Sequence, residues 1–543
     1  MVPALRRAVL AALVIVTSSF AQDQARDGAA DTGDPRRPNI VFVFSDDHAV
    51  DAIGAYRGRF AGLDPTPNID RLASMGAVFE NSFCTNSICG PSRAVILTGL
   101  HSHLNGVRGN GRQFDGDQWT FPKALREVGY QTALFGKWHL GSSPQGFDAW
   151  EVLPGQGEYY NPRMLSEGGE RRIDGHVSDI VTDLSIDWIR EAVESGDGAP
   201  FLLMCQHKAP HRNWMPAPRH LDLYDDVEIP EPASLFDDYR NRASPAAHQE
   251  MEIGDHMSTP VDLFVLPLDG SPPDRTGATD QSGLRNLGVM TVEQRAAWDA
   301  AFVDENREFL REPPTGEALI RWKYQRYAKN YLRAVRGVDD SVGRLMATLD
   351  ELGIADNTIF VYGSDQGFYL GEHGWFDKRW MYEQSMRMPL IVRWPGHVEP
   401  GRRPTELVQN LDYAPTFLDA AGAQIPDQLQ GRTLRPLLED RSPEGGWRDA
   451  VYFHYHAYPS IHMVARHYGV RTERYKLIRY YQFDEWELFD LQQDPMEMRN
   501  LYGDPEHFRL CVELAELLGQ MRAESRDDSD LSVMPREWQE KYR

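Results

Sequence analysis

Four short apolar segments of this chain each run directly into ionisable or amide residues. They are residues 39–44, 130–135, 201–205 and 358–362. Unbroken apolar runs are typical of strands that are buried on both faces of a parallel sheet. Because open α/β sheets bind ligands beyond the carboxyl ends of their strands, the polar residues that follow the four runs are predicted to meet in one crevice.

The residues that follow these runs suit metal binding and acid–base chemistry. In chain order they are Asp46 and Asp47, Lys137 and His139, His211 and Arg212, and Asp365 and Gln366. Adjacent carboxylates repel each other unless a positive charge lies beside them, and a hard divalent cation satisfies both. An isolated Asp-Asp pair is more often a solvated turn or a helix cap. The evidence for a site is therefore the repetition of the pattern.

Residues 89–99 predict a short helix with a cysteine at its start. Pro91 suits the first turn, where its missing N–H removes no helical bond, and Gly99 suits the end of the helix. Cys89 then lies at the positive end of the helix dipole, where free backbone N–H groups favour an anion. A buried thiol on an ordinary helix is the alternative interpretation.

The size and charge of the chain limit what it can be. A chain of 543 residues exceeds what one hydrophobic core supports, so one large and one small domain are expected. Its 57 Lys and Arg against 81 Asp and Glu give a net charge of −24, which argues against nonspecific nucleic-acid binding. An anionic substrate would need a local basic pocket on this acidic background.

The first 21 residues are predicted to be a secretory signal peptide. Arg6 and Arg7 precede an apolar run over residues 8–16, and the segment ends at Ala21. The run is too short to span a bilayer, no cysteine follows the cleavage point to take a lipid, and no membrane span is expected in the mature chain. The protein is expected to be exported, either periplasmic or secreted, with a flexible leader over residues 22–37.

The rest of the chain is expected to form two domains, over residues 38–440 and 441–543. Strand-like segments at 451–455, 469–471, 475–480 and 487–490 predict a small antiparallel sheet in the second domain, with a helix near 514–521. Residues 214–320 show no strong periodicity and indicate an insertion over the large sheet. Cys84, Cys205 and Cys511 are too few for a disulfide framework, and whether any two of them pair stays open.

Residues 89–99 resemble the signature of the type I sulfatases, in which the cysteine is oxidised after synthesis to formylglycine (3-oxoalanine). The matching residues are Cys89, Pro91, Ser92, Arg93, Leu97, Thr98 and Gly99. Residues 136–141, Asp365 with its glycine, and residues 475–477 and 487–490 are similar to that family in order and spacing. The resemblance implies an alkaline-phosphatase-like α/β fold, with a mixed or parallel sheet flanked by helices, and a smaller C-terminal α+β domain built on an antiparallel sheet.

The resemblance also implies a sulfuric ester hydrolase with one divalent cation, usually Ca²⁺. By similarity the metal ligands are Asp46, Asp47, the oxidised Cys89, Asp365 and Gln366, the last standing where the family more often has Asn. Arg93 is expected to hold the nucleophile, and Lys137 and Lys378 to clamp the sulfate. His139 would take a proton from the nucleophilic group, and His211 would protonate the leaving oxygen or bind sulfate. A formylglycine-generating or anaerobic maturing enzyme would be a partner.

Residues 208–214 and 377–383 resemble the branch of the family that contains N-acetylglucosamine-6-sulfatases of glycosaminoglycan and mucin breakdown. The expected substrate is therefore a sulfated carbohydrate, with 6-O-sulfated N-acetylglucosamine as the specific hypothesis. Other carbohydrate sulfatases, including the 2-O-uronate type, share parts of these motifs. Sugar contacts are expected from Arg212, His454, His456, His462, Arg466 and His467. An incidental role for any one of these histidines is an equally open interpretation.

Two other functions remain open. A phosphodiesterase or phosphonate monoester hydrolase of the same superfamily would share the formylglycine signature. A secreted glycan-binding protein on a degenerate sulfatase scaffold is the non-enzymatic alternative. It has the weakest support, because the nucleophile, the metal carboxylates and the bases are all present together.

Overall fold

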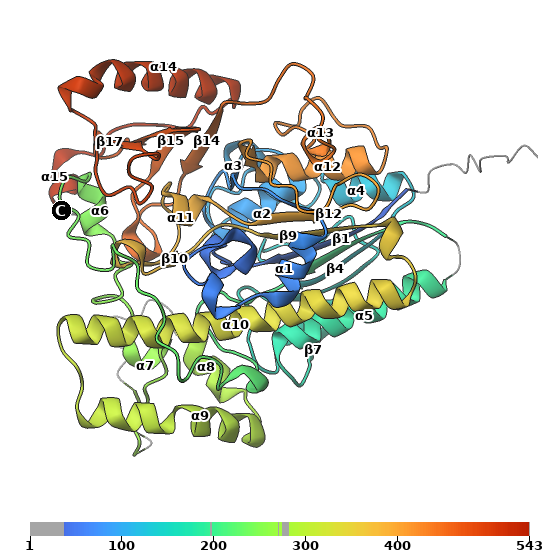
Figure 1. Ribbon diagram of the computed structural model, residues 1–543, viewed down its shortest axis with the longest axis horizontal. Helices are drawn as coiled ribbons and strands as arrows, with labels where there is room; N and C mark the ends of the chain where they lie inside the picture. Colours follow the sequence, from blue (N-terminus) through green and yellow to red (C-terminus); the bar gives the residue numbers. More distant parts are fainter. Residues whose placement is uncertain (1–36, 196–197, 270, 274–281, 542–543) are drawn as a thin grey trace, which may run out of the picture. The chain divides into compact units, whose positions relative to one another are not determined.

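The computed structural model describes residues 37–195, 198–269, 271–273 and 282–541 (Figure 1). The predicted signal peptide, and all but the last residue of the predicted leader, lie outside these residues, so cleavage and export remain predictions. No helix in this part of the chain is both long enough and apolar enough to cross a membrane.

A sheet of nine strands forms the centre of the fold. Its strands are β1 Asn39–Ser45, β2 Ala77–Val78, β4 Gln131–Lys137, β5 Ala149–Leu153, β6 Arg163–Ser166, β7 Gly169–Arg172, β8 Phe201–Gln206, β9 Thr358–Ser364 and β12 Leu390–Arg393. Their order is β2-β12-β9-β1-β8-β4-β5-β6-β7. The four predicted strands β9, β1, β8 and β4 are neighbours and run parallel, so their carboxyl ends lie at one edge of the sheet.

Alternate residues of β1 pack into two different hydrophobic cores. Ile40, Phe42 and Phe44 belong to the core covered by α2 Cys89–Thr98, α4 Phe121–Glu127 and α12 Tyr413–Ala420. Val41 and Val43 belong to the core on the other face, covered by α1 Pro67–Ser74, α5 Val177–Glu194 and α10 Glu317–Glu351 (Figure 1). The apolar run is continuous because both faces of the strand are covered by helices.

Residues 214–320 contain more helix than their sequence predicts. They form α6 Ser244–His248, α7 Thr259–Asp262, α8 Ser282–Gly288 and α9 Val292–Arg311. A capping box between Thr291 and Gln294 begins α9, and its buried side chains are Trp298, Phe302 and Asn306. Because so few positions of α9 are buried, the helix carries little apolar periodicity.

The C-terminal part forms a separate antiparallel sheet of four strands. Its elements are β14 Ala450–Tyr455, β15 His467–Thr472, β16 Tyr475–Tyr480 and β17 Glu485–Asp490, with α14 Phe508–Glu524 packed on one face (Figure 1). The predicted fold class is confirmed. Residues from Arg37 onward form one compact unit, so the domain boundary at residue 440 stays a prediction. All four cysteines are described, and none is in a disulfide.

The remaining helices and strands are short. They are β3 Ser82–Phe83, β10 Tyr369–Leu370, β11 Phe376–Asp377, β13 Val408–Gln409, α3 Ser102–Asn105, α11 Glu383–Met386, α13 Arg435–Leu438 and α15 Arg536–Lys541. Of these, β11 leads directly into Lys378, and α3 precedes a loop that reaches the start of α2.

Gly136 allows β4 and β8 to approach each other one residue before Lys137. Its φ is +105°, and a Cβ added there would lie 1.9 Å from the backbone oxygen of Gln206.

We expect Gly136→Ala to destabilise the fold by about 3 kcal/mol or more, because two backbone segments must move apart. Gly129→Ala is the matched control. Its φ is +90° with nothing within 4 Å of the added Cβ. That variant should cost only about 1–2 kcal/mol. Equal falls in the calorimetric melting temperature would contradict this account.

Candidate active site

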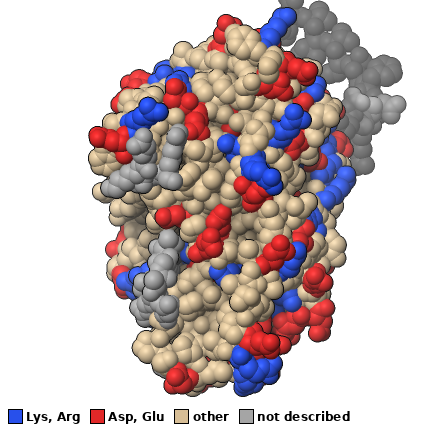
Figure 2. Space-filling model, turned by 90° about the vertical axis from the view of Figure 1, so that its left-hand side faces the viewer, with Lys and Arg blue, Asp and Glu red and all other residues tan. Residues whose placement is uncertain are grey.

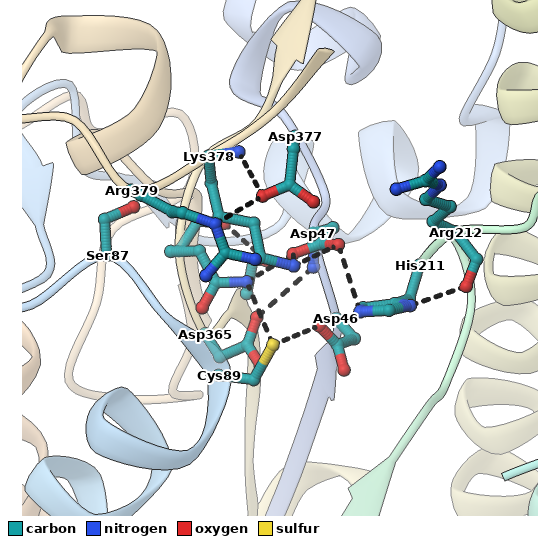
Figure 3. Close-up of polar contacts among 12 residues, drawn as sticks. Asp46, Asp47, Ser87, Cys89, His211, Arg212, Asp365, Asp377, Lys378 and Arg379 are labelled. Atoms are coloured by element: carbon teal, nitrogen blue, oxygen red, sulfur yellow. Dashed lines mark hydrogen bonds and ion pairs between the residues drawn. The ribbon is translucent and has the colours of Figure 1, made fainter. Parts of the chain in front are cut away.

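The residues that follow the four parallel strands meet at the predicted edge of the sheet. Asp46 and Asp47 follow β1, Asp365 follows β9, and all three side chains are fully buried. One carboxylate oxygen from each lies within 4.8 Å of the others (Figure 3). Three carboxylates at this separation repel one another strongly in a buried site, so they need positive charge beside them.

Helix α2 presents Cys89 to this cluster from its first position. The Cys89 Sγ atom lies 3.3 Å from Asp46 Oδ1 (Figure 3). The backbone N–H of Gly90 donates to Asn110 Oδ1 at 3.0 Å, so Asn110 satisfies one free donor of the helix start. Burial raises the pKa of the Cys89 thiol, and the Asp46 carboxylate adds to this. The unmodified side chain is therefore a neutral thiol.

Arg93, one turn along α2, links two of the carboxylates. Its Nε donates to Asp365 Oδ2 at 3.0 Å, its Nη2 lies 3.5 Å from Asp46 Oδ2, and its Nη1 donates to Gln206 Oε1 at 3.1 Å. The guanidinium is buried, so these ion pairs act in a medium where charges are weakly screened. Arg93 therefore holds the helix bearing Cys89 against the ends of β1, β8 and β9.

Two buried lysines complete the positive charge. Lys137 forms an ion pair with Asp46 and donates to Gln156 Oε1 at 2.5 Å. Lys378 Nζ lies 2.6 Å from Asp47 Oδ2. Burial alone would raise the pKa of Asp46, but the charges of Lys137 and Arg93 hold it well below its usual range.

The two other carboxylates remain under-compensated. Burial, opposed by Lys378, raises the pKa of Asp47 well above its usual range. Burial and the charge of Asp46 raise the pKa of Asp365 to about 6. The Oε1 atom of Gln366 is buried and accepts no hydrogen bond from the described residues, while its Nε2 donates to Asp47. Three carboxylates and an amide oxygen without a donor fit a hard divalent cation.

Two histidines lie at the same centre. His211 donates from Nδ1 to the backbone oxygen of Arg212 at 2.6 Å, which leaves Nε2 3.8 Å from Asp47 Oδ2 (Figure 3). His139 has a positive φ of 54°, and its buried Nδ1 has no hydrogen-bond partner among the described residues. Burial lowers the pKa of both imidazoles, and Lys137 adds to this, so both rings are neutral bases.

Known proteins match this chain over most of its length. The sulfatase family model matches residues 38–423, and a model described as N-sulphoglucosamine sulphohydrolase, C-terminal, matches residues 371–524. An N-acetylglucosamine-6-O-sulfatase of Bacteroides thetaiotaomicron is 45% identical over 91% of this chain and 88% of the relative. The chain belongs to the sulfatase family. The predictions of the family and of a sulfuric ester hydrolase are confirmed.

Solved structures of other proteins share this fold. One, described as a complex with its substrate D-glucosamine-2-N,6-O-disulfate, matches with a TM-score of 0.86 and 44% identity over 91% of this chain and 99% of that chain. A phosphonate monoester hydrolase of Agrobacterium radiobacter matches with a TM-score of 0.64 and 22% identity, over 90% of this chain and 96% of that chain, which shows the fold alone. Human N-acetylglucosamine-6-sulfatase is 26% identical over 77% of this chain and 67% of its own length.

Several of the predicted sugar contacts of this sulfatase are bonded to residues outside the catalytic centre, and their role in sugar binding stays a prediction. Arg212 pairs with the buried Asp262, Nε to Oδ1 at 2.8 Å and Nη2 to Oδ2 at 2.7 Å. His454 Nδ1 lies 2.6 Å from Asp527. His467 stacks on Trp380 and accepts from the backbone N–H of Met381 at 3.0 Å. No hydrogen bond or ion pair within the described chain joins His454, His456, Arg466 or His467 to Cys89 or the three aspartates.

A further polar cluster adjoins Lys378, and the sequence motifs did not predict that its residues would meet. Asp377 Oδ1 accepts from the backbone N–H of Lys378 at 2.8 Å and lies 3.2 Å from Arg379 Nε (Figure 3). His462, from the C-terminal part of the chain, has its Nε2 3.3 Å from Asp377 Oδ2. The charged run at residues 377–379 was the available signal, whereas the approach of His462 depends on tertiary structure.

A divalent cation should stabilise this sulfatase through the three aspartates. We expect Ca²⁺ to raise the melting temperature and a chelator to lower it, with a gain of about 3 kcal/mol at a hundredfold excess over Kd. Asp365→Asn should lose most of this response, because the site then lacks one charged ligand. Asp440→Asn, at an exposed aspartate paired with Arg402, should keep it. A wild-type response in Asp365→Asn, measured by calorimetry, would count against these ligands.

Proposed function

We propose that this sulfatase hydrolyses the 6-O-sulfate ester of N-acetylglucosamine in glycosaminoglycan or mucin glycans, using formylglycine formed from Cys89 and one divalent cation. The observation that carries the proposal is the convergence on Cys89 of two buried lysines, Arg93 and three carboxylates. A sulfate ester is an anion, and this centre combines a nucleophile position with buried cations that can neutralise it.

Formylglycine would supply the hydroxyl that attacks sulfur when hydrated, and the cation would neutralise the nonbridging oxygens. Asp46, Asp47, Asp365 and Gln366 would hold the cation, as their burial and the acceptor on Gln366 suggest. The overall reaction consumes water and releases inorganic sulfate and the sugar alcohol.

The remaining residues have roles that follow from their positions. Lys137 and Lys378 lie on two sides of the carboxylate cluster, where their ammonium groups can hold the sulfate. His139 can accept the proton of the nucleophilic residue, because its Nδ1 is neutral and has no partner in the described chain. His211 presents Nε2 to the centre, and a proton taken up at this atom can then be passed to the leaving oxygen.

The substrate hypothesis rests on the relatives and on the shape of the ester. Two relatives are named for N-acetylglucosamine 6-sulfate, and a 44% identical structure is described as holding a 6-O-sulfated glucosamine. A primary 6-O-sulfate projects from the ring on a flexible arm, which suits a nucleophile at the floor of a buried site. On the face shown in Figure 2, basic side chains are interspersed with acidic ones, which favours short or terminal substrates over long polyanions.

Export completes the proposal. The signal peptide predicted over residues 1–21 would deliver the enzyme to the periplasm or the exterior, where sulfated glycans are found. Maturation of Cys89 would require a formylglycine-generating or anaerobic maturing enzyme acting on the chain.

Cys89→Ala should abolish sulfate release while sparing the fold. We expect at least about a thousandfold loss of kcat, because no other group can replace the nucleophile. Cys511→Ala, in α14, is the matched control and should keep wild-type turnover. Peptide mass spectrometry after co-expression with a maturing enzyme should show formylglycine at position 89. An unmodified thiol throughout fully active protein would refute the formylglycine mechanism.

A panel of monosulfated sugars tests the regiochemistry. We expect release of sulfate from N-acetylglucosamine 6-sulfate, and a kcat/KM lower by at least about a hundredfold for 2-O-sulfated uronic acids, whose secondary ester brings the ring closer to the buried floor. Ion chromatography of released sulfate gives the measurement. Preference for the 2-O-sulfate would leave the sulfatase assignment standing and show the 6-O hypothesis to be wrong. Faster turnover of a phosphodiester would instead favour the alternative of a phosphodiesterase or phosphonate monoester hydrolase.

A further inference from the structure

A separate cavity of about 410 Å³ is lined by three arginines. Arg108 and Arg112 come from the loop after α3, and Arg466 lies just before β15. Within the described residues none of the three forms an ion pair. The arginines near the catalytic centre differ, because Arg93, Arg212 and Arg379 each face a carboxylate. Three guanidinium groups and one carboxylate line the cavity, which leaves an excess of positive charge there.

Two polar atoms at the wall of this cavity also lack partners. The Nε2 atom of His456 and the Nε atom of Arg466 are buried and have no hydrogen-bond partner among the described residues. One carboxylate, that of Asp530, lines the cavity, and it accepts from Ser532 N at 2.9 Å and Ser532 Oγ at 3.1 Å. On a chain with a net charge of −24, such a cavity favours an anionic ligand.

The cavity and the catalytic centre share one loop. Gly109 and Gly111 line the cavity, and Asn110 between them accepts the hydrogen bond from Gly90, the residue after Cys89. This loop is therefore the segment across which a saccharide with one ring at Cys89 would extend to reach the cavity. The neighbouring ring would bring its own substituents toward Arg108, Arg112 and Arg466.

We propose that this cavity is a subsite for a second anionic group, a sulfate or a carboxylate, on the sugar next to the ring whose sulfate is removed. The proposal rests on the proposed function, because it requires a sulfated saccharide at Cys89. Planar guanidinium groups bind carboxylates and sulfates through paired hydrogen bonds, so both groups suit the cavity. The subsite would select substrates by the charge of the neighbouring sugar.

Binding to the Cys89→Ala protein tests the subsite without turnover. Three disaccharides share a terminal 6-O-sulfated N-acetylglucosamine and differ in the neighbouring sugar, which is neutral, sulfated or a uronic acid. Isothermal titration calorimetry should show the sulfated or the uronic acid ligand binding at least about tenfold more tightly than the neutral one. Comparison of these two ligands shows which anion the cavity takes.

Two variants, Arg112→Gln and Arg112→Gln/Arg466→Gln, test the arginines. In both, the Kd of the neutral disaccharide divided by the Kd of the charged one should fall toward one. Arg311→Gln, at the exposed end of α9, is the matched control and should keep the ratio. Arg112 is exposed, so its single variant keeps the test valid if the double variant fails to fold. Equal binding of all three ligands, or a ratio that survives in both arginine variants, overturns the subsite and leaves the proposed function standing. Failure to bind any of the three overturns both.

Discussion

Three fully buried carboxylates held within a few ångströms of each other are the constraint on which the rest of this sulfatase depends. Asp46, Asp47 and Asp365 are brought together because β1 and β9 are adjacent and parallel, and the sheet cannot form without placing them side by side. Their mutual repulsion would be prohibitive without compensation. Arg93 and two lysines supply part of it, and the two lysines are the cations that we propose to hold the anionic ester. In the proposed function these charges serve both the stability of the site and its chemistry.

The C-terminal sheet contributes to the site by holding the loop that carries Lys378. Glu383, five residues after it, lies 2.8 Å from Lys476 Nζ and 3.1 Å from Arg471, both on the small sheet. Lys476 also pairs with Glu497 at 2.6 Å, and burial raises the pKa of Glu497 to about 7. Removing one of these four charged side chains would leave a buried charge unpaired. The network therefore holds the loop that follows Lys378 against the small sheet. The small sheet is therefore part of the catalytic architecture.

Backbone conformation at the site is unusual for the residue types that occupy it. Asp47, His139, Asp377 and Arg379 have φ values of 67°, 54°, 76° and 100°. Side chains with a Cβ rarely adopt this left-handed region, and each instance costs of the order of 1–2 kcal/mol. Packing of the surrounding sheet and helices must supply that energy. Four of the positive φ values at non-glycine residues in the described chain therefore belong to this centre.

Local patterns in the sequence determined the central strands of this protein, the helix at Cys89 and the carboxylates that meet. The unbroken apolar runs predicted the four central strands, and a proline and a glycine at the right spacing predicted the helix that begins at Cys89. The ends of those strands predicted which carboxylates would meet, because parallel neighbours share an edge. Such patterns could not predict which distant residues would pair. Arg212 forms hydrogen bonds with Asp262, 50 positions away, and His454 with Asp527, 73 positions away. His462 reaches Asp377 from the short 3-10 turn Ile461–Met463, which lies between β14 and β15. Sequence periodicity reports which face of an element is buried, whereas the partner of a buried charge is decided by how the elements pack.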